Sequence, residues 1–158
     1  MHSLIEPTID DIYGARTAIK GHILRTPLRH YPALSQLLDA DVWVKHENFQ
    51  LLGAFKIRGG INLVSQTSQA ERDRGFVTAS SGNHGQSIAY AAREFGSACT
   101  VVLPEGANPA KANSITALGA DLVFHGDVFE RSREHAEKLA EKEGMRFIHA
   151  ANEPSLVA

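Results

Sequence analysis

One lysine in this chain lies among residue types that suit covalent chemistry on a flat ligand. It is Lys56, in the stretch Gly-Ala-Phe-Lys-Ile-Arg-Gly-Gly. The surrounding glycines would let a ligand approach the backbone closely, and Phe55 can pack beside that ligand. Apolar residues recur at helical spacing after the lysine, which predicts that Lys56 stands at a helix start. A helix start and desolvation both favour the neutral amine that a Schiff-base lysine needs. Taken alone, the motif is equally compatible with a solvated surface lysine.

A second stretch, residues 80–85, reads Ser-Ser-Gly-Asn-His-Gly and is rich in hydrogen-bond donors. We expect a loop here, between a short strand over 75–79 and a helix over about 86–95. Ligands of parallel sheets bind beyond the carboxyl ends of the strands, and a helix N-terminus favours an anion. The loop therefore suits a carboxylate or a phosphate. The alternative is a structural turn with a helix cap. The Gly-Lys-Ser/Thr ending of a P-loop and the dinucleotide G-x-G-x-x-G pattern are both missing.

Length, composition and charge exclude several classes of protein. The 158 residues suffice for a domain with a core, and 43% hydrophobic with 22% charged residues is ordinary for a globular protein. A net charge of −2 argues against a nucleic-acid partner. No apolar run has membrane-spanning length, and acidic residues near the N-terminus argue against a signal peptide. The sequence predicts a cytoplasmic location without a membrane partner.

Neither the cysteine nor the histidines predict a metal site. The single Cys99 lies in an apolar run and is expected to be a buried structural thiol. None of the eight histidines shows H-E-x-x-H spacing or a Cys/His cluster. We expect His135 to lie on the solvated side of a helix whose charges form i,i+4 pairs.

Helices and strands that alternate along the chain must position these two stretches. Thr8 with Asp11 predicts a capped helix over 9–19, and a mixed pattern predicts a strand over 42–47. The second part reads more regularly, with Asp127 and Glu130 as a capping pair for its last helix. The further expected elements are helices over 32–38, 109–119 and 127–144, and strands over 98–103, 122–124 and 146–149. Short apolar strands between helices predict an α/β fold, with an open, mostly parallel sheet covered by helices on both faces.

The two stretches together resemble a known family. The stretch over 52–60, Leu-Gly-Ala-Phe-Lys-Ile-Arg-Gly-Gly, resembles the cofactor-lysine motif of the threonine dehydratase and serine racemase group. The stretch over 80–86, Ser-Ser-Gly-Asn-His-Gly-Gln, resembles the substrate and cofactor loop of the same group. Residues 25–28 and 45–50 add to the resemblance. The group consists of fold-type II enzymes, with a tryptophan-synthase-β-like fold, that depend on pyridoxal 5′-phosphate.

The resemblance implies a role for each matching residue. Lys56 would hold the cofactor as a Schiff base and move the substrate α-proton, and Phe55 would pack near the pyridine ring. Asn83 would hydrogen-bond the cofactor 3′-oxygen. The substrate carboxylate would be bound by Ser81 together with its loop neighbours. These substrate-binding residues are Ser80, Ser81, Gly82, Asn83 and His84. In the racemases of the group, the residue that matches Ser81 also serves as acid and base on the opposite face.

The implied chemistry is β-elimination from a hydroxy amino acid, which yields a 2-oxo acid and ammonia. Threonine, serine and 3-hydroxyaspartate stay open as substrates, and racemisation of serine stays open as a neighbouring activity. The family has Thr-Gly-Ser before its Phe-Lys, whereas this chain has Leu52, Gly53 and Ala54, so two hydroxyls are lost beside the cofactor. A non-catalytic fragment that binds a partner or an amino acid through the loop is the second class of function.

The resemblance also suggests how the chain divides. We expect part of the large cofactor domain over 1–68, a complete small αβα domain over 69–149, and the start of a return to the large domain over 150–158. The family chain continues well past this point. It supplies there a glycine-rich phosphate loop and the partner of the pyridine nitrogen. The expectation is therefore that this chain alone is inactive and that the full-length form is a homo-oligomer.

Overall fold

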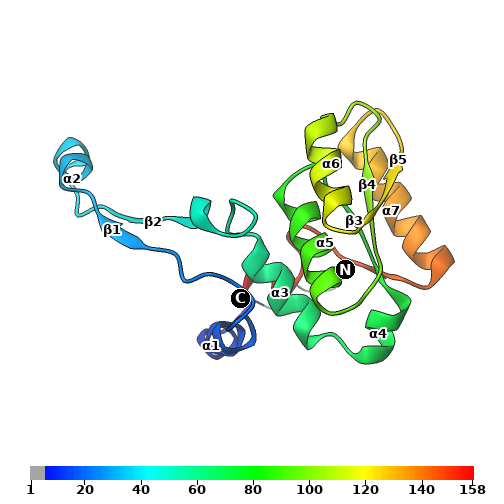
Figure 1. The fold of residues 1–158 in the computed structure, drawn as a ribbon, viewed down its shortest axis with the longest axis horizontal. Helices are drawn as coiled ribbons and strands as arrows, with labels where there is room; N and C mark the ends of the chain where they lie inside the picture. The colour runs from blue at the N-terminus through cyan, green and yellow to red at the C-terminus, as the bar shows by residue number, and fades with distance from the viewer. Residues whose placement is uncertain (1–5) are drawn as a thin grey trace.

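The computed structural model of the protein describes residues 6–158 (Figure 1), so the first five residues of the expected large-domain segment lie outside the described part. Helices and strands alternate along most of the chain. The helices are α1 (Ile9–Ala18), α2 (Pro32–Leu38), α3 (Ile57–Gln66), α4 (Gln69–Arg74), α5 (Asn83–Glu94), α6 (Pro109–Ala117), α7 (Phe129–Glu143) and α8 (Pro154–Val157). The strands are β1 (Leu28–His30), β2 (Trp43–Lys45), β3 (Phe76–Ala79), β4 (Cys99–Leu103), β5 (Asp121–Phe124) and β6 (Arg146–Phe147).

Strands β3 to β6 form a four-stranded sheet in the order β5-β4-β3-β6, and every neighbouring pair in it is parallel. The register places Phe76 of β3 opposite Cys99 of β4 and opposite Arg146 of β6. The central strand β3 is buried along its whole length, as expected for a parallel strand covered on both faces. The expected α/β fold class is confirmed.

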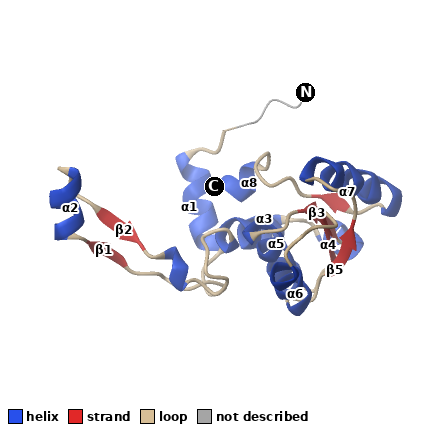
Figure 2. Ribbon diagram, turned by 90° about the horizontal axis from the view of Figure 1, so that it is seen from above, coloured by secondary structure: helices blue, strands red, loops and turns tan. Residues whose placement is uncertain are grey.

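Side chains from the two faces of this sheet enter two separate cores. Val101 and Leu103 of β4 face the core that contains Ile88 of α5 and Ile115 of α6. On the opposite face, a smaller core joins β3 and β4 to α7; its buried members are Val77, Ala79, Val102, Ala136 and Ala140. Alternate residues of β4 therefore point to opposite layers of helices, and Figure 2 shows α7 apart from α5 and α6.

The N-terminal part of the chain is more open. Helix α1 begins at a capping box between Thr8 and Asp11, as the sequence predicts. Strands β1 and β2 pair antiparallel and, with α2, form an arm that extends away from the sheet domain (Figure 1). Leu37 is 78% exposed and Trp43 56% exposed on this arm. Among the described residues, no helix is long and apolar enough to cross a membrane.

Helix α3 connects the N-terminal part of the chain to the sheet domain, since it follows the N-terminal part in sequence and packs closely on α5. A Cβ atom added at Gly60 would lie 2.2 Å from Ser87 Oγ and 2.7 Å from the Ser87 carbonyl oxygen. Gly59 makes a similar approach to α8, where an added Cβ would lie 2.2 Å from the Leu156 carbonyl oxygen. The two glycines after Lys56 therefore serve helix packing on two sides.

The structure corrects two expected element boundaries and contains one helix, α4, that was not predicted from the sequence. Helix α5 begins at Asn83 and not near residue 86, because burial of the His84 side chain against Thr78 outweighs the weak helix propensity of Asn-His-Gly. Residues 69–74 form helix α4, which begins with a Ser68–Glu71 capping box that the sequence carries plainly. Helix α7 has Val128 at its N-cap.

The predicted capping pair of α7 is therefore wrong. With Val128 at the N-cap and Phe129 as the first helical residue, Asp127 lies outside the helix. Glu130 is then the second helical residue and not the third, so the reciprocal bonds of a capping box cannot form. The Ser132 hydroxyl donates instead to the carbonyl oxygen of His125, at 2.8 Å, and ties the helix start to the end of β5.

Substitution of Gly60 by alanine should test the α3–α5 contact. We expect Gly60→Ala to lower the free energy of unfolding by about 1–3 kcal/mol, because the new methyl group displaces Ser87. Gly14→Ala in α1 is the matched control, since no atom lies within 4 Å of its added Cβ and the gain in helix propensity is up to about 1 kcal/mol. Urea unfolding followed by circular dichroism gives both values. Equal stability of the two variants would contradict the close contact.

Candidate functional site

Lys56 stands at the N-cap of α3, which confirms the predicted position at a helix start. Its side chain is partly buried, and its carbonyl oxygen accepts a hydrogen bond of 2.6 Å from the hydroxyl of Ser87 on α5. Lys56 therefore lies where the two parts of the chain meet. Ser87 is fully buried, so this bond is formed away from water.

Phe55 and Lys56 line a hollow of about 320 Å³, together with residues near the C-terminal end such as Ala150 and Val157. The ammonium nitrogen of Lys56 lies 5.6 Å from the centroid of the Phe55 ring, and that ring is 59% exposed. Gly53, just before them, has φ +65°, and no atom lies within 4 Å of its added Cβ. An exposed aromatic face beside an amine and open space over a glycine are compatible with a flat ligand at this place.

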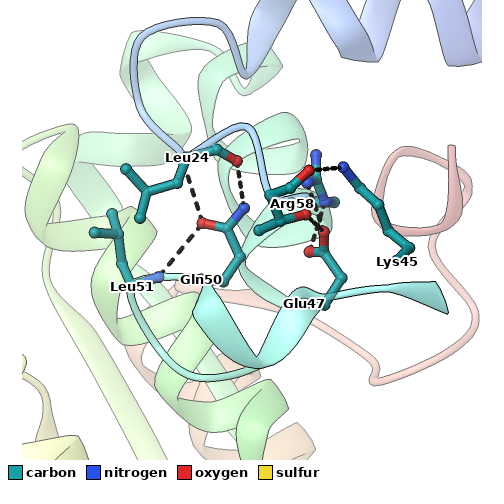
Figure 3. A network of polar contacts seen from close by, with 7 residues as sticks. Leu24, Lys45, Glu47, Gln50, Leu51 and Arg58 are labelled. Carbon is teal, nitrogen blue, oxygen red and sulfur yellow. Dashed lines mark hydrogen bonds and ion pairs between the residues drawn. The ribbon is translucent and has the colours of Figure 1, made fainter. Parts of the chain in front are cut away.

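A polar network fixes the segment that leads into α3 (Figure 3). The Arg58 guanidinium donates two hydrogen bonds of 2.8 Å to the two carboxylate oxygens of Glu47. Thr26 donates its hydroxyl to the same carboxylate, and Lys45 donates to the Thr26 carbonyl oxygen at 2.6 Å. The Arg58 bond, followed by the Thr26 bond and the Arg58 and Lys45 charges, holds the pKa of Glu47 below its usual range despite partial burial.

Gln50 adds a second anchor beside this ion pair (Figure 3). Its amide nitrogen donates to the Leu24 carbonyl oxygen at 2.6 Å, and its amide oxygen accepts from the Leu24 N–H at 3.1 Å. Gln50 is 4% exposed, so both bonds are shielded from water. The side-chain amide of Gln50 thus pairs with the backbone N–H and carbonyl of Leu24, much as backbone groups pair between two strands.

The 80–85 stretch leads from the end of β3 into α5, and its last three residues form the first turn of that helix. Ser80 is buried, and its hydroxyl accepts a hydrogen bond of 3.1 Å from the Gly82 N–H. Ser81 is partly buried and Asn83 is exposed. No atom lies within 4 Å of a Cβ added at Gly82, so the outer side of this turn is open. The free N–H groups of the α5 N-terminus are therefore accessible to an anion.

His84 is the buried member of this stretch, with 5% of its surface exposed. Its Nε2 lies 2.9 Å from the Thr78 hydroxyl, and that hydroxyl donates to the Ile148 carbonyl oxygen at 2.8 Å. Because the one hydroxyl proton is used in this way, Nε2 carries the imidazole proton and donates it to Thr78. Nδ1 is then a bare acceptor, and it has no hydrogen-bond partner among the described residues.

Burial lowers the pKa of His84 to about 4, and the positive charge of Lys56 contributes to this shift in the same direction. His84 is consequently neutral at physiological pH. The loop residues themselves do not line the hollow beside Phe55.

Sequence reasoning missed several residues of this site. Glu47 was expected in a strand, but it begins a short 3₁₀ turn (Glu47–Phe49) and pairs with Arg58. Thr26, Gln50 and Ser87 had no assigned role, although each is buried and polar. Their partners are 21 to 31 residues away in the sequence, so no local pattern could reveal the bonds. What marks these residues is that they are polar and buried, and burial is seen only in the folded structure.

The other titratable candidates lie elsewhere. Cys99 is buried as expected, and burial raises the pKa of its thiol to about 12. His135 was expected in solvent, but it is partly buried and its ring stacks on His125, with 3.9 Å between centroids. Of the predicted i,i+4 pairs on α7, Arg133–Glu137 forms. Among residues 6–158, no cluster of three or more metal-binding side chains is present.

Comparison with known proteins gives matches along most of the chain. The profile of the family described as "Pyridoxal-phosphate dependent enzyme" matches residues 19–158. An L-threonine ammonia-lyase of Thermotoga maritima is 38% identical over 151 residues, which are 96% of this chain and 38% of that protein. A threonine dehydratase of Nicotiana attenuata is 36% identical over 132 residues, which are 84% of this chain and 22% of that protein.

Solved structures show the same similarity. A serine racemase from Dictyostelium discoideum superposes with a TM-score of 0.88 at 32% identity, over 96% of this chain and 49% of that one. A threonine deaminase from Solanum lycopersicum gives a TM-score of 0.83 at 30% identity, over 98% of this chain and 48% of that one. The chain therefore spans about half, or less, of the length of the proteins it matches.

The buried neutral state of His84 predicts a pH dependence of stability. The unfolded pKa is about 6.5 and the folded pKa about 4, so the native state binds fewer protons in between. The contribution of His84 is complete above about pH 6.5. Up to about 3 kcal/mol is lost as the pH falls from 6.5 towards 4.

Urea unfolding at a series of pH values measures this loss, and a His84→Gln variant should show a smaller slope across the same window. His135→Gln is the comparison variant, because burial also lowers the pKa of His135 but this residue is only partly buried, so its removal should reduce the slope less than removal of His84 does. An unchanged slope in His84→Gln would show that His84 is not buried in its neutral form.

Proposed function

Because the chain belongs to the family of pyridoxal-phosphate dependent enzymes, we propose that it carries the lysine and the substrate loop of a threonine or serine dehydratase, an ammonia-lyase that acts by β-elimination. The observation that carries this proposal is the placement of Lys56. It stands at a helix start, beside an exposed aromatic ring and against α5, the helix whose first turn is formed by the end of the Ser-Ser-Gly-Asn-His-Gly stretch. The family's cofactor, pyridoxal 5′-phosphate, bonds covalently to a lysine amine.

The residues present fit this cofactor on structural grounds. The hollow beside Phe55 and Lys56, about 320 Å³, lies within the range of about 300–1,000 Å³ for small-molecule pockets. The open sides of Gly53 and Gly82 leave room beside the backbone. When bound, the cofactor supplies an electron sink for the substrate α-carbon. Lys56 would hold it, Phe55 would contact its ring, and Asn83 would donate a hydrogen bond to it.

The protein's own groups would do the remaining work. Ser80, Ser81, Gly82, Asn83 and His84 would bind the substrate carboxylate at the α5 N-terminus, His84 through its backbone N–H because its ring proton is donated to Thr78. Lys56 Nζ would take the α-proton, after which the β-hydroxyl leaves as water. Addition of water to the product then releases ammonia and a 2-oxo acid, 2-oxobutyrate from threonine. The buried His84 would stay neutral throughout, because its pKa is about 4.

A serine racemase is the second candidate. Serine racemases are among the similar structures, and the Dictyostelium discoideum protein is 32% identical to this chain. Ser81 is partly buried between β3 and α5, where its hydroxyl would serve as acid and base on the face opposite Lys56. Composition and family resemblance further support a cytoplasmic enzyme that assembles as a homo-oligomer when full-length.

Reductive trapping tests Lys56 directly. The chain is incubated with pyridoxal 5′-phosphate and then borohydride, and peptides are analysed by mass spectrometry. We expect one dominant adduct, at Lys56, because this amine is partly buried beside the hollow. Lys56→Ala should lose the adduct, whereas Lys111→Ala, at an exposed residue of α6, should retain it. Equal labelling of several exposed lysines would count against a cofactor site.

Activity distinguishes the two candidates and the fragment alternative. The chain is assayed alone and mixed with the C-terminal part of the Thermotoga maritima relative, expressed as a separate polypeptide. If the chain is a racemase, Ser81→Ala should slow D-serine formation by about 100-fold or more, the usual contribution of one general acid or base. Formation of 2-oxo acid should change by less than about tenfold, since Lys56 moves that proton.

Tight association of the two polypeptides without ammonia or 2-oxo acid would instead support a non-catalytic binding role. Loss of both activities in Ser81→Ala, with the fold intact, would assign Ser81 to binding of the carboxylate alone.

A further inference from the structure

We propose that a hollow beside α1, lined by residues other than those of the 80–85 stretch, binds a phosphate monoester of a small organic group. The hollow has a volume of about 550 Å³. Five cationic side chains line it and no acidic side chain does; they are Arg16, Lys20, Arg25, Lys45 and Arg58. The chain as a whole carries a net charge of −2, so this gathering of cations does not reflect a basic protein.

The charge of the hollow is largely uncompensated. Arg58 is paired with Glu47, and Lys45 donates to a neutral carbonyl. Within residues 6–158, Arg16, Lys20 and Arg25 form no ion pair. Five cations less one carboxylate leave four positive charges around one concave surface. Like charges that converge in this way repel one another, and a concave surface focuses their field on an incoming anion.

The chemistry of the walls indicates the kind of anion. Three of the five cations are arginines, whose planar fork matches the oxygens of a phosphate. The remaining lining includes Ile19, Ile23 and Leu24, so part of the surface is apolar. A ligand that combines a dianionic phosphate with a small apolar group would use both kinds of surface.

The site is built on fixed backbone and not on loose side chains alone. Leu24 is held through both its N–H and its carbonyl by the buried Gln50 (Figure 3). Arg58 is oriented by its two bonds to Glu47 and has 30% of its side chain exposed. Two parts of the lining, Leu24 and Arg58, are therefore held by hydrogen bonds before any ligand binds, which reduces the ordering cost of binding.

The site is also connected to Lys56, since Arg58 lies two residues further along the chain. Arg58 accordingly belongs to the hollow, to the Glu47 pair and to the first turn of α3. An anion that competes with Glu47 for the guanidinium would disturb the pair that fixes this turn. The consequence is that ligand binding at the hollow alters the surroundings of the lysine without contact with it.

Phenyl phosphate is the probe, because it has no aldehyde and cannot attach to a lysine. We expect 10 mM phenyl phosphate to raise the Tm of the 158-residue chain relative to sodium chloride of equal ionic strength. Inorganic phosphate should raise it less, since it leaves the apolar lining unused. Lys20→Gln and Arg25→Gln should each weaken the apparent affinity by about fivefold, the contribution of one well-placed exposed charge.

Two controls separate this site from others. Lys111→Gln removes an exposed charge on α6 and should leave the effect unchanged. Lys56→Ala should also leave it unchanged, so failure of the proposed cofactor site and failure of this site give different results. Phenyl phosphate should in addition protect Arg25 from phenylglyoxal, with Arg131 on α7 as the reference.

An equal Tm shift in sodium chloride, or equal loss of the effect in Lys111→Gln, would overturn the proposal. Binding of an oligoglutamate peptide in place of phenyl phosphate would overturn it as well, because it would assign the hollow to an acidic protein segment.

Discussion

The close approach of α3 to α5 is the constraint on which the candidate site depends. A hydrogen bond from the buried Ser87 hydroxyl to the Lys56 carbonyl crosses this contact, and Gly60 provides the space for it. Helix α5 in turn begins at Asn83, within the Ser-Ser-Gly-Asn-His-Gly stretch. The position of the lysine relative to that stretch is therefore set by helix packing, in a core that includes the buried Ile61 of α3 and Ile88 of α5.

Two kinds of interaction hold the backbone on either side of Lys56. On the α5 side, apolar burial dominates, with Ile57, Ile61 and Ile88 all fully buried. On the other side, a network of charged and amide groups joins Glu47, Arg58 and Gln50 to the segment around Leu24. Such a network is directional, and removal of one partner leaves the other buried and unpaired. Hydrogen bonds and an ion pair thus position the segment that leads into α3, in a part of the chain that has little apolar core.

Local sequence signals predicted the regular elements well. The Thr8–Asp11 capping box, the helical spacing after Lys56 and the short apolar strands all appear in the structure. The first turn of α5 was missed because Asn, His and Gly favour loops when considered alone. Only the tertiary contact of His84 with Thr78, itself bonded to Ile148 some 70 residues away, makes the helix begin early.

The same limit explains what could be predicted of the site. Family resemblance identified Lys56 and the 80–85 stretch, because their residue types are contiguous in the sequence. The pairing of Arg58 with Glu47 and the convergence of cations beside α1 are produced by folding, and residues far apart in the chain contribute to them.

The arm formed by β1, α2 and β2 has a kinetic consequence. Its ladder joins only three residue pairs, Leu28 with Lys45, Arg29 with Val44 and His30 with Trp43, and α2 has no buried residue. A two-stranded ribbon with so little apolar cover is marginally stable in water. Its amide hydrogens should exchange with solvent through local opening, long before those of the buried strand β3. The arm should therefore open without unfolding of the parallel sheet, as a local event of low free energy.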